Sequence, residues 1–157
     1  MSFLSKVQAK TTTHLTYDEA MRRHKKQWLE GKHKEWGDLE NDYFFPYGDQ
    51  YKQEGFVRVE IPTKDIETVA HNRKRIEQYK EILKRQGEKS MGELWVSAGR
   101  KLNDGTIQRH ADRLTFSALD GNHRLKAAQE LGHPMQDVIM PASHWKAHQD
   151  GAVLVVE

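Results

Sequence analysis

The chain has 157 residues, of which 36% are hydrophobic and 31% charged, and its formal net charge is +2. This length fits one domain with an appendage, and the composition is not polar enough for a disordered chain. The absence of cysteine excludes a disulfide framework, a thiol nucleophile and a cysteine-ligated zinc site. Since no apolar run of about 20 residues and no secretory signal is present, we expect a cytoplasmic protein without a membrane partner.

Charge is distributed unevenly in the N-terminal third. Residues 1–34 contain eight Lys or Arg and three Asp or Glu residues, whereas residues 35–50 contain five acidic residues and no Lys or Arg. The stretch TYDE fits a capping box that opens a helix, and Gly31 is expected to end it. The cations of this helix are candidate nucleic-acid contacts, and a solvated helix face explains them equally well: Arg22, Arg23, Lys25 and Lys26.

Residues 36–55 are rich in aromatic and turn-forming residues. A loop packed by its own rings is the favoured interpretation, because aromatic side chains are more often buried than displayed. A base-stacking surface is the alternative. The aromatic residues concerned are Trp36, Tyr43, Phe44, Phe45, Tyr47 and Tyr51.

From residue 56 onward the pattern alternates between strands and helices. The periodicities predict strands over 56–61, 93–102, 113–120, 137–145 and 151–157, and helices over 66–86 and 123–131. This order predicts a small α/β or α+β layer fold, with a mixed sheet and flanking helices. Residues 1–55 then form a basic helical extension and an aromatic loop, and residues 56–157 form the domain.

The stretch LDGNHRLKAAQELG joins a predicted strand to a predicted helix. A helix N-terminus offers backbone N–H groups and a positive dipole end to an anion. Gly121 allows close backbone approach, Arg124 suits phosphate, and Asn122 can donate or accept. His123 is a candidate acid or base, and Asp120 can hold a metal or take a proton. The composition therefore fits a phosphate cradle.

Structural roles for the same side chains remain open. Asp120 and Asn122 are good helix caps, and Arg124 can pair with Asp120 or Glu130. His123 can be a packed histidine of the core. His144 and His148 are spaced like a metal-binding pair, but they lack a zinc motif, so a structural zinc is the less favoured interpretation.

The junction resembles the ParB N-terminal/sulfiredoxin-like superfamily, in which many sequences carry D-G-x-H-R where this chain has residues 120–124. Lys126 stands where an Arg is usual, and Asn72 and Arg73 loosely match a second family box. The resemblance covers about residues 56–142 and implies a nucleotide or phosphate site. Asn122 replaces the cysteine that sulfiredoxins need, which excludes sulfinic acid reduction. Partition proteins of this superfamily follow the domain with a helix-turn-helix, and from the few residues after the junction helix we expect no centromere recognition by that route.

Two classes of function follow from this resemblance. In the first, an Mg²⁺-dependent NTPase or nuclease binds a nucleoside triphosphate (ATP or CTP) and uses Asp120 and His123 as catalytic groups, with Asp120 also binding the metal. The phosphates would be held by residues of the junction and of the second box: Gly121, Asn122, His123, Arg124, Lys126, Asn72 and Arg73. In the second, a non-catalytic regulator from a phage or plasmid binds DNA or a host protein.

Overall fold

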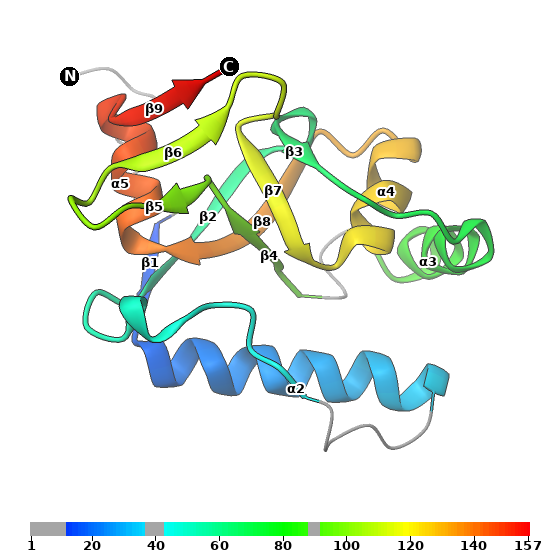
Figure 1. Ribbon diagram of the computed structural model, residues 1–157. Coiled ribbons are helices and arrows are strands. Elements are labelled where there is room, and N and C mark those ends of the chain that lie inside the picture. Colours follow the sequence, from blue (N-terminus) through cyan, green and yellow to red (C-terminus); the bar gives the residue numbers. More distant parts are fainter. Residues whose placement is uncertain (1–11, 37–42, 88–91) are drawn as a thin grey trace.

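The computed structural model describes residues 12–36, 43–87 and 92–157 (Figure 1). Residues 1–11 and 37–42 of the predicted extension lie outside this part. Among the described residues, no helix is both long and apolar enough to cross a membrane. In chain order the elements are β1 (Thr13–Leu15), α2 (Tyr17–Trp36), the 3₁₀ turn η2 (Asp49–Tyr51), β2 (Phe56–Pro62), the 3₁₀ turn η3 (Thr63–Asp65), β3 (Ile66–Glu67), α3 (Arg73–Gln86), β4 (Leu94–Ser97), β5 (Arg100–Lys101), β6 (Ile107–His110), β7 (Phe116–Asp120), α4 (Asn122–Glu130), β8 (Met135–Pro141), α5 (Ala142–Asp150) and β9 (Val153–Val156).

The strands form two sheets, and this confirms the predicted α+β class. The larger sheet is mixed, with the order β1-β2-β8-β4-β7-β3, and the smaller sheet has the order β5-β6-β9. Helix α2 lies along one side of the larger sheet, while α3 and α4 lie together at one end of the molecule (Figure 1). The end of β7 and the start of α4 therefore lie where α2, α3 and α4 come close to the larger sheet.

The described residues before residue 56 pack onto the domain, and one of their elements joins the larger sheet. β1 pairs antiparallel with β2, and Thr16 and Glu19 form the expected capping box at the start of α2. The aromatic residues that follow α2 contribute to a core cluster with Phe56, Trp95 and Ile139. Packing is thus the correct interpretation for Phe45, Tyr47 and Tyr51, which are buried, whereas Phe44 is 74% exposed. The side chain of Trp36 lies outside the described ones.

Two helix boundaries differ from the prediction. The helix predicted from residue 66 begins at Arg73, because Ile66 pairs with Phe116 as strand β3 and Asn72 caps α3 by accepting from the backbone N–H of Arg75. Helix α2 continues through Gly31 to Trp36. A single glycine costs a helix only about 1 kcal/mol, which the remaining residues of a long helix can offset.

Two predicted strands are also wrong in part. Residues 93–102 split into β4 and β5, which belong to different sheets, and Gly99 between them has a positive φ of 143°. The strand predicted over 137–145 ends at Pro141, and residues 142–150 form α5. A helix buries His144 and Ala147 on one face, a spacing that a strand cannot provide. Strands β1, β3 and β6 have no counterpart in the prediction.

His144 of α5 ties that helix to the aromatic cluster. Its Nδ1 accepts a hydrogen bond from the backbone N–H of Ala98 at 3.1 Å, and its Nε2 lies 2.9 Å from the Tyr51 hydroxyl. Burial lowers the pKa of His144 to about 4, against an ordinary value of 6.5. Since Nδ1 accepts, a neutral His144 carries its proton on Nε2 and donates it to Tyr51.

Acid should destabilise the fold through this residue. The unfolded chain binds a proton at His144 below about pH 6.5, whereas the folded protein does so only near pH 4. The free energy of unfolding is therefore insensitive to His144 above pH 6.5 and falls by about 1.4 kcal/mol per pH unit as the pH drops from 6.5 toward 4. Urea unfolding across this window should show that slope.

His144→Asn keeps an acceptor for Ala98 and removes the titration. This variant should be less stable than the parent at pH 7 but show a flatter pH dependence between 6.5 and 4. Burial also lowers the pKa of His148, so His148→Gln is the comparison variant. The slope of its free energy of unfolding against pH is compared with that of His144→Asn. An undiminished slope in His144→Asn would contradict the assignment.

Candidate functional site

A groove of about 1400 Å³ lies between α2, α3 and the β7–α4 junction. One wall comes from the part of α2 between Arg23 and Glu30, and another from one face of α3. The junction contributes the consecutive residues 120–124, and Arg58, Glu93, Trp95 and Asp137 contribute from the sheet side. The sequence-predicted junction therefore opens into this groove.

Asp120 is held in a fixed orientation at this junction. Its Oδ2 lies 2.8 Å from Nε2 of His24, and its Oδ1 accepts from the backbone N–H of Gly121 at 2.8 Å. His24 is buried within a ring of aromatic side chains, while the side chain of Asp120 remains 41% exposed. The protein thus anchors both oxygens of the carboxylate while part of the side chain faces solvent.

Tyr43 completes this arrangement behind His24. The Tyr43 hydroxyl lies 2.9 Å from Nδ1 of His24 and 3.4 Å from the carbonyl oxygen of Met21. Burial, and then the charge of Asp120, raises the pKa of Tyr43 to about 12, so this residue stays a neutral phenol.

The hydrogen bonds of the three side chains are mutually consistent. An ionised Asp120 only accepts, so Nε2 of His24 carries a proton and donates to Oδ2. In the neutral tautomer with that proton on Nε2, Nδ1 is the acceptor for the Tyr43 hydroxyl.

Gly121 makes the sharp turn from β7 into α4. Its φ is 85°, and a Cβ at this position would lie 2.7 Å from Cδ2 of Leu94. Any other residue would be strained at this φ and would collide with the core. The turn places the first residues of α4 directly after Asp120, at the positive end of the helix.

Asn122 and His123 make contacts within the protein. Oδ1 of Asn122 accepts from the Thr68 hydroxyl and from the backbone N–H of Val69, each at 3.0 Å. Nε2 of His123 lies 3.4 Å from the backbone N–H of Asn72, which can donate to it. Both side chains line the groove and also fasten the segment before α3 to the junction.

Arg124 is the cation of the junction that lines the groove. Burial lowers the pKa of its guanidinium, and the nearby Tyr79, Asp120 and Glu93 act in the opposite direction. Arginine guanidinium groups stay protonated in proteins, so Arg124 is the junction's cationic group at the groove, near Tyr79, Asp120 and Glu93.

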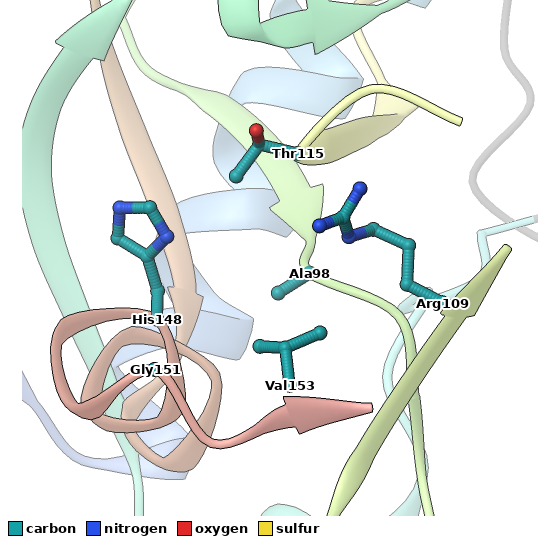
Figure 2. Close-up of a pocket in the computed structure, with 6 residues that line it drawn as sticks. All are labelled: Ala98, Arg109, Thr115, His148, Gly151 and Val153. Atoms are coloured by element: carbon teal, nitrogen blue, oxygen red, sulfur yellow. The ribbon is translucent and has the colours of Figure 1, made fainter. Parts of the chain in front are cut away.

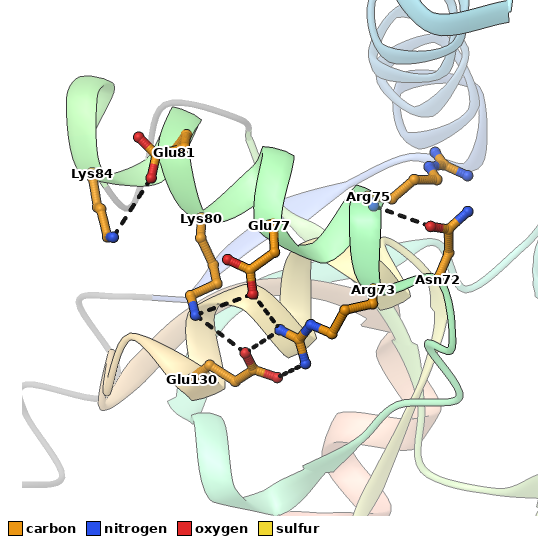
Figure 3. A network of polar contacts seen from close by, with 8 residues as sticks. All are labelled: Asn72, Arg73, Arg75, Glu77, Lys80, Glu81, Lys84 and Glu130. Carbon is orange, nitrogen blue, oxygen red and sulfur yellow. Dashed lines mark hydrogen bonds and ion pairs between the residues drawn. The ribbon is translucent and has the colours of Figure 1, made fainter.

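Arg73 lies away from the groove. It contacts Glu77 at 2.9 Å and Glu130 at 2.8 Å, and Lys80 joins the same network between α3 and α4 (Figure 3). These contacts, led by the hydrogen bond from Arg73, lower the pKa of Glu130 to about 2. Figure 3 shows Arg75 on the opposite side of α3, directed toward α2. Lys126 is not among the groove-lining residues.

Some of the cations predicted on α2 line the groove, and others do not. Arg23 and Lys26 line the groove, whereas Arg22 does not, and Lys25 lies over the ring of Tyr43 at 5.8 Å. Arg23 pairs with Glu93 at 3.1 Å. Glu93 is 4% exposed and also receives Arg58 at 3.2 Å and Gln27 at 2.7 Å. A buried carboxylate therefore engages two of the groove's cations.

The sequence did not single out His24, Glu93 or Arg58 as members of a site, and it placed Tyr43 only in the aromatic loop with its two open interpretations. His24 gave the one usable signal, because it falls on the otherwise apolar stripe of α2. A polar residue on such a stripe needs a buried partner. That partner lies 96 positions along the chain, so only the fold identifies it.

A second, smaller pocket of about 260 Å³ lies beside α5, β6 and β9 (Figure 2). Two of its side chains make contacts within the protein. Arg109 donates to the carbonyl oxygen of Arg113, and His148 stacks on Trp145.

Within the described part of the chain, no group of three or more His, Asp or Glu side chains is arranged to hold a metal ion. Comparison with family models, curated proteins and solved structures gave no match for this chain.

A double-mutant cycle should detect the contact between α2 and the junction. We expect His24→Leu and Asp120→Ala to be non-additive in urea unfolding, with a coupling free energy of about 1 to 2 kcal/mol, because each single change removes the same charge-assisted hydrogen bond. Asp120→Ala combined with Lys146→Ala is the additive control, because the exposed side chain of Lys146 pairs with Asp150 on α5. A His24–Asp120 cycle as additive as this control would show that the contact does not form.

Proposed function

We propose that the groove binds a phosphate-bearing ligand, a nucleotide or a nucleic acid, with one phosphate at the β7–α4 junction. The observation that carries this proposal is the oriented and partly exposed carboxylate of Asp120, which lines the groove beside Arg124 at the start of a helix. A helix N-terminus and a guanidinium both favour phosphate. The D-G-x-H-R pattern of residues 120–124, which resembles the ParB-like superfamily, supports the same assignment.

Asp120 is the candidate acid–base group and the candidate Mg²⁺ ligand. A carboxylate with two anchored oxygens can accept a proton from an attacking water or hydroxyl. Mg²⁺ is commonly held by one or two carboxylates together with water and substrate phosphates, so a single carboxylate suffices when the nucleotide brings the ion. His24 and Tyr43 position Asp120 from behind, and His123 lines the groove beside it as a second candidate acid.

Calorimetric titration with ATP, CTP and GTP, each with Mg²⁺, tests binding. At least one nucleotide should bind with micromolar affinity, and Arg124→Ala should weaken that binding at least about tenfold, because a charge-assisted contact to phosphate contributes about 1.5 kcal/mol or more. Arg73→Ala is the matched control, since Arg73 pairs with Glu77 and Glu130 outside the groove. Equal losses in the two variants would contradict a phosphate site at the junction.

Turnover separates an enzyme from a binding module. Asp120→Asn keeps the size of the side chain and removes its basicity, so nucleotide or phosphodiester hydrolysis should fall by about a hundredfold or more. Hydrolysis measured by phosphate release at saturating ligand reports this loss directly. Hydrolysis at the parental rate in this variant would exclude Asp120 as the catalytic base.

A further inference from the structure

The groove is larger than a site for one small molecule requires. Its volume of about 1400 Å³ exceeds the roughly 300 to 1000 Å³ that small-molecule pockets usually occupy. The excess volume extends away from Asp120, because the groove continues along α3 as far as Gln86. A mononucleotide at the junction would leave that part of the groove unfilled.

One face of α3 lines the groove over the whole helix. Residues Arg75, Tyr79, Ile82 and Gln86 follow each other at spacings of three or four, which places them on a single face. The helix starts next to the junction, since the Asn72 backbone contacts His123. Fourteen residues at 1.5 Å each extend about 20 Å, which at the 3.4 Å spacing of a stacked strand corresponds to about six nucleotides.

Cations are placed along this path and beyond the junction. Lys74, Arg75 and Arg85 of α3 line the groove, and Lys26 of α2 lines it on the opposite wall. Arg23 and Arg58 are engaged by Glu93, so they contribute less to the field that an anion meets. Glu30 and Glu81 line the groove as well, so the cations are concentrated along α3, with Lys26 on the opposite wall. Cations spaced along a helix suit a chain of phosphates better than one triphosphate.

Apolar surface lies between these cations. Trp28 and Tyr79 line the groove and are half-buried, and Val69 is 63% exposed at its edge. Aromatic faces in a cationic groove stack with bases, and bases are available for stacking only when they are unpaired. The combination therefore favours a single strand over a duplex.

From these observations we infer that the ligand of the groove is a single-stranded nucleic acid that extends from the β7–α4 junction along α3 for about six nucleotides. This inference rests on the proposed function, because it places one phosphate of the strand at Asp120 and Arg124. It adds the polymeric nature of the ligand and the contribution of α3.

Fluorescence anisotropy with labelled dT2, dT4, dT6, dT8 and dT12 in EDTA tests the inference without cleavage. Affinity should rise steeply up to about six nucleotides and then level off. Arg85→Ala, at the far end of α3, should weaken dT12 binding about three- to tenfold and reduce the salt slope by about one, while leaving dT2 unchanged. Lys84→Ala is the matched control, because Lys84 neighbours Arg85 but pairs with Glu81 and does not line the groove.

The outcomes separate this inference from the proposed function. If ATP binds through Arg124 but affinity does not increase with oligonucleotide length and Arg85→Ala has no effect, the inference is wrong and the phosphate site stands. If neither ATP nor any oligonucleotide binds, both fail. Tighter binding of a 12-base-pair duplex than of dT12 would also overturn the inference. A parallel titration with U12 distinguishes DNA from RNA, and stronger binding of either strand than of the duplex supports it.

Discussion

The hydrogen bond between His24 and Asp120 is the contact on which the candidate site depends. It joins the middle of α2 to the end of β7 and fixes the carboxylate that lines the groove. Because His24 is almost completely buried, its ring nitrogens must find partners inside the protein, and Asp120 and Tyr43 provide them. The N-terminal helix is therefore part of the site, since it forms one wall of the groove and positions the carboxylate.

The fold divides chemically similar residues into two groups. Arg73 and Arg75 are neighbours in sequence, yet one joins α3 to α4 through Glu130 and the other lines the groove (Figure 3). The helical repeat produces this division, because residues two apart point in different directions. Composition alone does not reveal it.

Much of the fold could be predicted where local signals agreed. The capping box of α2, strand β2 and helix α4 were recognisable because caps, periodicity and a terminal glycine agree in those stretches. The errors arose where tertiary contacts overrode the local pattern. Ile66 pairs with β7 instead of starting a helix, and the stretch after Pro141 turns into α5, so that His144 can reach Tyr51. Short strands such as β3 and β6 depend on partners distant in sequence.

By itself, the sequence determined the α+β class and the strand-to-helix junction with its Asp, Gly, His and Arg, because these features depend on periodicity and on the chemistry of neighbouring residues. Only the tertiary structure decided which of these side chains line the groove and that His24, Tyr43 and Glu93 belong beside them. The physical reason is that a buried polar group is satisfied by whatever the fold brings within hydrogen-bonding distance. For Asp120, that partner is a histidine 96 residues earlier in the chain.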